Sequence, residues 1–79
     1  MQTVFVMIKC ELGQTYRTAA SIADTVDEAA EVYSTSGGYD LLVKFHLEPQ
    51  QDIGRFVTER IQTMPGVKDT YTVTTFKAF

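Results

Sequence analysis

The sequence predicts a single α+β domain, and two observations lead to that fold class. Apolar residues recur at every second position in some segments, as in β-strands, and at helical spacing in two others. The chain has 79 residues, so residues 1–79 form one domain. A chain of this length buries only about 60% of its unfolded surface. Small domains usually compensate with disulfides, a metal or self-association.

The first half of the chain predicts a strand, a helix and a strand. Val4–Lys9 is apolar and rich in β-branched residues, which favours a strand, and Gly13 ends it. Gln14–Val26 predicts a helix, because its apolar residues follow an i, i+3, i+4, i+7 spacing: Ala19, Ile22, Ala23 and Val26. Glu28–Thr35 predicts the second strand, with Ala30 and Val32 on one side.

The second half repeats the pattern after a turn. Ser36-Gly37-Gly38 is typical of a hairpin turn, and Asp40–Leu47 predicts the clearest strand. Its side chains alternate between one side (Leu41, Val43, Phe45, Leu47) and the other (Leu42, Lys44, His46). Pro49 favours the start of the next helix, which Pro65-Gly66 ends. That helix has an apolar stripe of Ile53, Phe56, Val57, Ile61 and Met64, and Val67–Phe76 predicts the last strand.

The resulting order, βαββαβ, predicts a ferredoxin-like fold of the type found in dimeric α/β-barrels. Right-handed crossovers place both helices on one face of a four-stranded antiparallel sheet and leave the other face bare. The first strand is apolar on both sides, with Val4, Val6 and Ile8 against Phe5 and Met7. We expect Leu42, Phe76 and the methyl groups of Thr70, Thr72 and Thr74 to join Phe5 and Met7 on the bare face. Burial of each large side chain would contribute roughly 1.5–3 kcal/mol, which predicts a face-to-face oligomer.

Composition argues against several classes of partner. Seven basic and ten acidic residues give a net charge of −3, and the basic residues are scattered along the chain. Phosphate neutralisation needs adjacent cations, so direct binding to nucleic acid is not expected. The N-terminus has neither a basic start nor a cleavage site after an apolar run, and no segment has membrane-spanning length. The expected location is therefore cytoplasmic, without membrane association.

The sequence offers little support for catalysis. His46 lies in mid-strand without an obvious carboxylate partner, which favours a structural or interfacial role. Cys10 is the only cysteine and lies in an apolar strand pattern, where a buried hydrophobe is expected. No metal-ligand spacing and no phosphate-binding loop is present. We therefore predict no catalytic residues, no metal and no cofactor.

One group of residues has the chemistry to bind a free amino acid. Ser36, Gly37, Gly38, Tyr39 and Asp40 form a flexible turn with exposed backbone groups, an aromatic ring and a carboxylate. Backbone N–H groups can hold a ligand carboxylate, and Asp40 can hold an ammonium group. Thr70 and Thr72 present hydroxyls two residues apart on the last strand. A turn that merely closes a hairpin is the alternative.

The whole chain resembles the effector-binding (RAM) domain of the Lrp/AsnC, or feast/famine, regulators. The resemblance rests on Phe5-Val6-x-Ile8-Lys9, Glu31-Val32-Tyr33, Gly37-Gly38-Tyr39-Asp40-Leu41-Leu42, Met64-Pro65-Gly66-Val67 and Thr70-x-Thr72. It implies dimers joined through their sheets, assembly into octamers or decamers, and an amino-acid effector bound between dimers. It also implies that Ser36 to Asp40 contact the effector, together with Thr70 and Thr72.

The resemblance departs from the family in one respect. Family regulators carry an N-terminal helix-turn-helix, whereas this sequence starts at the first strand, as in stand-alone members. Such a member is expected to act without its own DNA-binding domain, and co-assembly with a full-length regulator is one possible role. Two alternatives stay open: a small enzyme of the dimeric α/β-barrel type using His46 or Tyr71, and a structural oligomer or adaptor without a ligand.

Overall fold

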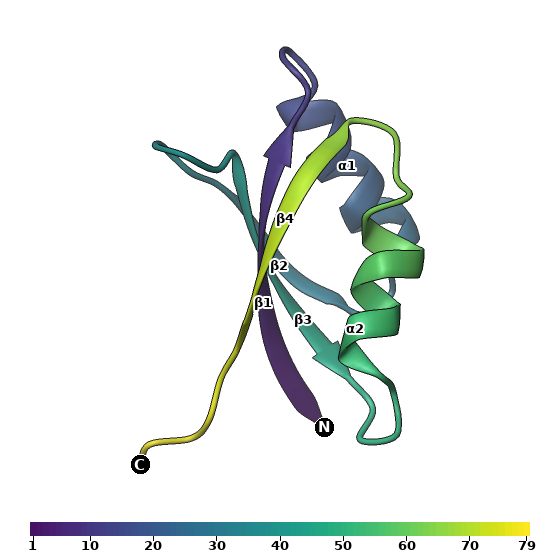
Figure 1. The fold of residues 1–79 in the computed structure, drawn as a ribbon, viewed down its shortest axis with the longest axis vertical. Helices are drawn as coiled ribbons and strands as arrows, with labels where there is room; N and C mark the ends of the chain where they lie inside the picture. The colour runs from purple at the N-terminus through teal and green to yellow at the C-terminus, as the bar shows by residue number, and fades with distance from the viewer.

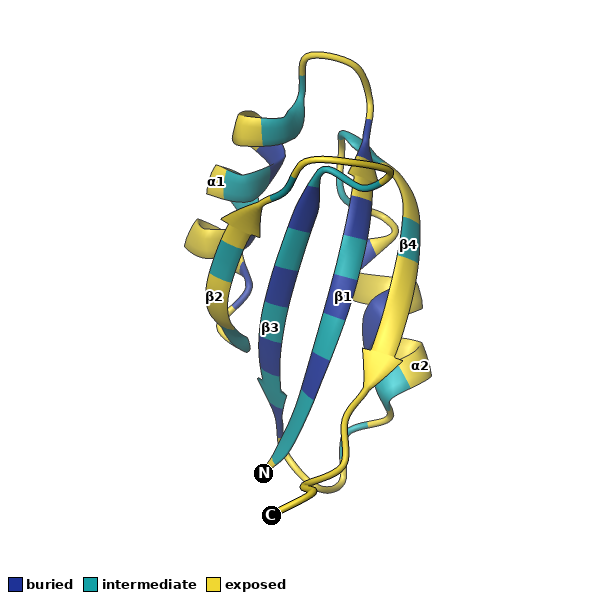
Figure 2. Cartoon of the chain, turned by 90° about the vertical axis from the view of Figure 1, so that its left-hand side faces the viewer, coloured by how far each residue is buried: buried dark blue, intermediate teal, exposed yellow.

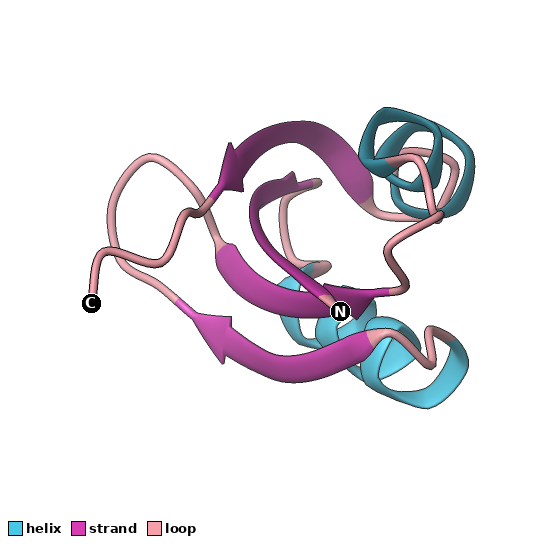
Figure 3. Cartoon of the chain, turned by 90° about the horizontal axis from the view of Figure 1, so that it is seen from below, coloured by secondary structure: helices cyan, strands magenta, loops and turns pink.

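The computed structural model describes residues 1–79 and confirms the predicted fold. Four antiparallel strands form one sheet in the order β2-β3-β1-β4, and both helices pack on the same face of it (Figures 1 and 3). The elements are β1 (Gln2–Cys10), α1 (Thr15–Thr25), β2 (Ala29–Ser34), β3 (Leu41–Leu47), α2 (Ile53–Phe56), η1 (Val57–Ile61) and β4 (Val67–Thr74). The π-helical turn η1 directly continues α2. No helix combines the length and the apolar character needed to cross a membrane.

The core lies between the helices and the two central strands. β1 and β3 alternate strictly, as predicted, and every second residue of each is buried (Figure 2). The buried strand residues are Val4, Val6, Ile8, Cys10, Leu41, Val43, Phe45 and Leu47. The second helix contributes Phe56, Val57 and Ile61 from its predicted stripe, and the Phe56 ring packs edge-to-face on Phe45 at 5.1 Å between centroids. Ile53 and Met64 pack at the margin of this core.

The buried stripe of α1 differs from the prediction by one position. Ile22 and Val26 are buried as expected, but Ala23 is exposed and Thr18 is buried in its place. The reason is the close approach of the chain at Gly66, where φ is +93° and a Cβ would overlap Thr18 Oγ1. The start of β4 therefore lies directly over the Thr18 side of α1.

The second helix begins later than predicted. Pro49 lies in the preceding loop, and α2 starts only at Ile53. The Asp52 side chain accepts a hydrogen bond from the backbone N–H of Arg55 at 3.1 Å, which satisfies a free donor of the first turn. A capping carboxylate thus outweighs the preference of proline for the first turn.

A bulge changes the side assignment in β2. Ala29 pairs with Phe45, but the next pair is Glu31 with Lys44, so Ala30 is the extra residue. Ala29 and Val32 consequently pack against the core, whereas Ala30 is exposed. The prediction that Ala30 shares a side with Val32 was wrong, because simple alternation does not reveal a bulge.

We call the face of the sheet away from the helices the open face. The residues that β4 contributes to this face differ from the prediction. Thr70, Thr72 and Thr74 pair with Ile8, Val6 and Val4, so they lie on the helix side. Tyr71 and Val73 lie on the open face, and Phe76 is exposed beyond the end of β4. The apolar side chains of the open face are Phe5, Met7, Tyr33, Leu42, Tyr71 and Val73. The bare apolar face is thus present, with aromatic and valine side chains where threonine methyl groups were expected.

Candidate functional site

The turn between β2 and β3 presents free backbone donors. The N–H groups of Ser36, Gly37, Gly38 and Tyr39 make no backbone hydrogen bond within the chain, and no side chain accepts from them. Gly37 has a φ of +107°, a conformation that favours glycine. Inside the turn, Thr35 Oγ1 donates to the Tyr39 carbonyl at 2.7 Å. The turn reaches out on the open side of the sheet (Figure 1), where its donors can meet a ligand.

Asp40 anchors the base of this turn. Its Oδ2 accepts a hydrogen bond from the Cys10 backbone N–H at 2.8 Å, and its own N–H donates to the Ile8 carbonyl at 2.9 Å. No hydrogen bond in the chain involves Asp40 Oδ1. The carboxylate therefore joins the turn to the end of β1 and still has one oxygen available to a ligand ammonium group.

The tip of the turn makes two contacts, and both lie toward the open face. Lys9 Nζ donates to the Gly38 carbonyl at 3.3 Å. The Tyr39 ring lies 6.2 Å from the Tyr71 ring between centroids, at an interplanar angle of 34°. Lys9 and Tyr71 both belong to the open face, since Lys9 pairs with Asp69 and Tyr71 with Met7. The tip is thus held by the open face and its base by the end of β1.

The threonine pair lies elsewhere. Thr70 and Thr72 are on the helix side of β4, an edge strand, where Gln62 Nε2 donates to Thr70 Oγ1 at 2.8 Å. Gln62 follows η1 and was missed in the sequence analysis. It lies one residue past the buried Ile61, but nothing in the spacing shows that it faces β4.

One chain does not bring the turn and the threonine pair onto one ligand. Ile8 separates them, because it accepts from Asp40 N–H on one side and pairs with Thr70 on the other. Two strand spacings are about 10 Å. The tip of the turn also lies on the open side, whereas the Thr70 hydroxyl is on the helix side. The predicted site residues therefore form two separate groups in a single chain.

A small cleft lies beside the base of the turn. It has a volume of about 130 Å³, and its polar lining includes Lys9, Lys68, Thr15, Glu11 and Asp40. Two lysines and two acidic residues thus line a space large enough for only a few atoms. This balance of charges suits the main-chain end of a zwitterion better than a polyanion.

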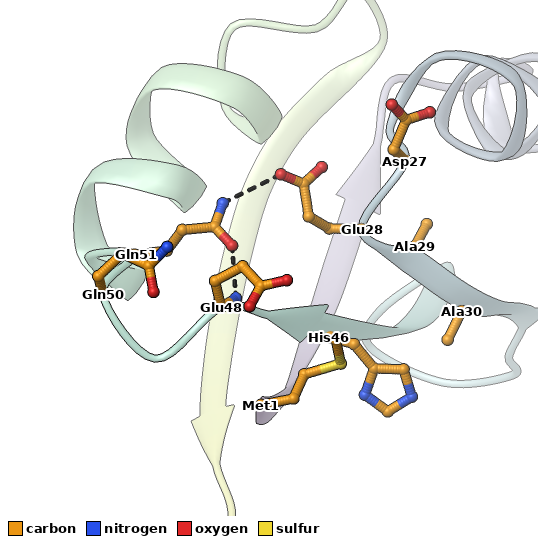
Figure 4. Close-up of a pocket in the computed structure, with 9 residues that line it drawn as sticks. All are labelled: Met1, Asp27, Glu28, Ala29, Ala30, His46, Glu48, Gln50 and Gln51. Carbon is orange, nitrogen blue, oxygen red and sulfur yellow. Dashed lines mark hydrogen bonds between the residues drawn. The ribbon is translucent and has the colours of Figure 1, made fainter.

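A larger hollow of about 540 Å³ lies at the opposite end of the sheet (Figure 4). It lies where β2 begins and β3 ends, and its walls include Ala30, His46 and Glu28. Glu28 accepts hydrogen bonds from Gln51 Nε2 at 3.0 Å and from Arg60. Burial opposes ionisation of Glu28, but the hydrogen bonds from Gln51, its own backbone and Arg60 outweigh burial and lower the pKa of this carboxyl. This carboxylate therefore serves to attach η1 to the start of β2.

Of the two residues considered for an enzymatic role, Tyr71 is exposed on the open face, and His46 lies on the same face. The Nδ1 of His46 is 3.1 Å from Thr3 Oγ1. Burial raises the pKa of the Cys10 thiol, and the Thr18 and Thr15 hydroxyls only partly oppose that effect. No group of three or more metal-ligating side chains occurs. The raised pKa of Cys10 disfavours the thiolate form that a cysteine nucleophile requires.

Comparisons with known proteins agree with this architecture. Residues 3–79 match the model of the Lrp/AsnC ligand binding domain. The transcriptional regulator FL11 of Pyrococcus horikoshii is 32% identical over 73 residues, covering 92% of this chain and 47% of FL11. The chain spans about half the length of the curated relatives it matches, and these relatives are HTH-type transcriptional regulators.

Solved structures extend the comparison. The protein TTHA0845 of Thermus thermophilus is 33% identical with a TM-score of 0.88, and the match covers 100% of this chain and 98% of that one. The regulator NMB0573 of Neisseria meningitidis, solved as a complex with L-Met, has a TM-score of 0.82 at 15% identity, over 98% of this chain and 51% of that one. At that identity the likeness concerns the fold alone.

Proposed function

The chain belongs to the Lrp/AsnC ligand-binding domain family, and from that premise we propose that it is an effector-sensing and self-associating module of the kind found in these transcriptional regulators. Its effector is a small molecule, and the class we propose is a free α-amino acid. The observation that carries the proposal is the β2–β3 turn, which contains four free backbone N–H groups and ends at the Asp40 carboxylate.

The chemistry of the turn matches the two charged ends of an amino acid. Successive backbone N–H groups in a turn can bind an anion, which suits the α-carboxylate. Asp40 Oδ1 then accepts from the α-ammonium group. NMB0573, a protein of the same fold, was solved with L-Met, which supports testing amino acids first.

We further propose that the complete site lies between copies of the chain. Within one chain the turn and the Gln62–Thr70 pair are on opposite sides of the sheet. A neighbouring copy can bring its own Thr70 and Thr72 to the turn, and the ligand side chain then lies between the two. Ligand binding in this arrangement requires assembly beyond the monomer, and an octamer or decamer would provide such contacts.

Self-association through the open face is the second part of the proposal. Six apolar side chains lie together there, and Phe5, Met7 and Leu42 are only partly covered in the single chain. Burial of each large apolar side chain contributes roughly 1.5–3 kcal/mol, enough for a small domain to depend on it. The occupant that we propose is a second copy of the chain, face to face.

Calorimetric titration with each of the twenty amino acids, combined with light scattering, tests the effector class. We expect at least one amino acid to bind. Asp40→Asn keeps an acceptor for Cys10 N–H but removes the charge that pairs with the ammonium group, so we expect about 10-fold weaker binding. If none of the twenty binds the assembled protein, the proposal of an amino-acid effector is wrong. The proposal of self-association is tested separately, by light scattering.

The threonine pair has a matched control. Thr70→Val removes the hydroxyl that Gln62 contacts and should weaken binding of the same amino acid roughly 5- to 10-fold. Thr58→Val makes the same chemical change at an exposed position of η1 and should leave binding unchanged. Equal effects of the two substitutions would exclude Thr70 from the site.

A further inference from the structure

The β2–β3 turn and the open face are connected by very few contacts. The base of the turn is fixed to β1 through Asp40, independently of the open face. Beyond the base, two contacts leave the turn: the Lys9–Gly38 hydrogen bond and the Tyr39–Tyr71 ring contact. Both end on side chains of the open face. The position of the tip therefore depends on side chains that a second copy would cover.

In the single chain these two contacts are weak. The Lys9–Gly38 hydrogen bond is long, at 3.3 Å, and exposed, and Tyr71 is 57% exposed. An exposed tyrosine ring changes rotamer within nanoseconds, so it cannot hold its neighbour in one position. Covering Tyr71 would restrict its rotamers and thereby restrict Tyr39, whose backbone carbonyl is already held by Thr35.

We propose that the Tyr39–Tyr71 contact makes the order of the effector turn depend on coverage of the open face by a second copy of the chain. This inference rests on the two surfaces of the proposed function and adds the contact that couples them. Tyr71 is then a positioning residue, since it acts on the turn through Tyr39 and need not touch the effector. By thermodynamic linkage, ordering of the turn by an effector would strengthen association by the same factor.

Backbone ¹⁵N relaxation of Gly37 and Gly38 tests the coupling without any effector. In the associated wild-type protein we expect order parameters near those of rigid backbone, roughly 0.8. Tyr71→Ala should lower them below about 0.6 in protein that sedimentation shows to be still associated. Val73→Ala is the matched control, because Val73 lies on the same face of β4 without a ring contact to the turn. It should leave the order of both glycines unchanged.

A monomeric variant separates coverage from the contact itself. Phe5→Asp places a charge in the open face while the buried side of β1 stays intact. We expect a folded monomer in which Gly37 and Gly38 are as mobile as in Tyr71→Ala, although Tyr71 is present. Leu42→Asp provides a second monomeric variant if Phe5→Asp does not fold.

A double-mutant cycle gives an independent measure of the same contact. Tyr39→Ala should raise the dissociation constant of the assembly roughly 2- to 10-fold, the range of one aromatic pair. In a Tyr71→Ala background the same change should have almost no effect.

The outcomes are distinct. A monomeric wild type at NMR concentrations would overturn both this inference and the proposed self-association. A monomeric Phe5→Asp variant with a turn as rigid as in the wild-type assembly would overturn the inference alone. Failure of every amino acid to bind would affect only the effector, because the relaxation experiment uses none.

Discussion

The two faces of the sheet carry similar numbers of apolar side chains in β1 but differ in what covers them. On the helix side, Val4, Val6 and Ile8 are fully buried. On the open face, Phe5 and Met7 from the same strand are only partly covered. Nothing in the local sequence distinguishes the two sets. The difference shows that one face is completed within the chain and that the other lacks a covering layer.

Polar groups strengthen this contrast. On the helix side the buried polar side chain is Thr18. On the open face, charged groups lie around the apolar centre, including the Lys44–Glu31 ion pair at 3.6 Å and the Lys9 side chain. An apolar centre with a polar rim is typical of protein interfaces. The helix side thus carries the stability of the fold, and the open face has the composition of a contact surface.

Truncation of the core should produce the largest effect. Phe45→Ala removes a fully buried ring that packs on Phe56 and should lower the free energy of unfolding by about 3–5 kcal/mol. Phe5→Ala, on the open face, should cost about 1 kcal/mol in the dissociated chain. Urea denaturation of dilute protein measures both. Equal losses would show that the open face is as important for folding as the core.

Disruption of the open face should instead affect association. Met7→Asp places a carboxylate in the apolar centre and should raise the dissociation constant of the self-assembly about 100-fold or more, because an unpaired charge would be desolvated. Sedimentation over a range of concentrations measures this change. Thr58→Asp on the outer side of η1 is the control and should leave assembly intact. Unchanged assembly of Met7→Asp would place the interface elsewhere.

The close approach of β4 to α1 predicts a third effect. Gly66→Ala forces a left-handed φ on alanine and an overlap with Thr18 Oγ1, so the free energy of unfolding should fall by about 2 kcal/mol or more. Gly13→Ala has a similar strain at φ +77° but open space around its Cβ, so it should cost less. Thermal or urea denaturation of both variants isolates the overlap from the strain. Equal losses of unfolding free energy in the two variants would show that the overlap with Thr18 does not contribute to the effect of Gly66→Ala.

Most of the fold could be predicted from the sequence, because period-two and helical patterns report directly which side of an element is buried. The alternation in Asp40–Leu47 gave the correct side for every residue of β3. The errors occurred where a distant contact decides the outcome. The bulge at Ala30, the burial of Thr18 beneath Gly66 and the late start of α2 after the Asp52 cap depend on pairing, close approach and capping. None of these changes the local pattern of apolar residues.

The candidate site was less predictable. The turn from Ser36 to Asp40 was found because glycines and exposed polar groups leave a local signal, and Tyr39 and Asp40 flank it. Sequence spacing placed Thr70 and Thr72 on the wrong face, because the face of an edge strand depends on its register with β1. Gln62 was missed for the same reason, since its contact with Thr70 joins a helix end to a strand. The roles of these residues in ligand binding stay predictions until a ligand is bound.

Acid sensitivity gives the smallest expected difference between the two faces. Glu28 attaches η1 to β2 on the helix side, and its pKa is lowered in the folded chain. Its stabilisation is therefore complete above the unfolded pKa of about 4.5 and is lost as the pH falls through the lower folded pKa. We expect Glu28→Gln to lower the free energy of unfolding at pH 7 by about 1 kcal/mol or less and to flatten its decline below about pH 4.5.

Glu31, on the open face, provides the matched carboxylate. Hydrogen bonding from the Tyr33 hydroxyl and the charge of Lys44 lower the pKa of Glu31, but the Glu31 side chain is exposed and solvent screens both contacts. Ionised Glu31 therefore also contributes to the free energy of unfolding, and this contribution is lost as the pH falls. It is smaller than the contribution of Glu28. Urea denaturation between pH 3 and 7 in dilute protein should show a clear change for Glu28→Gln and little for Glu31→Gln. A larger change for Glu31→Gln would mean that the open face is covered even in dilute solution, because only removal from solvent can strengthen this ion pair.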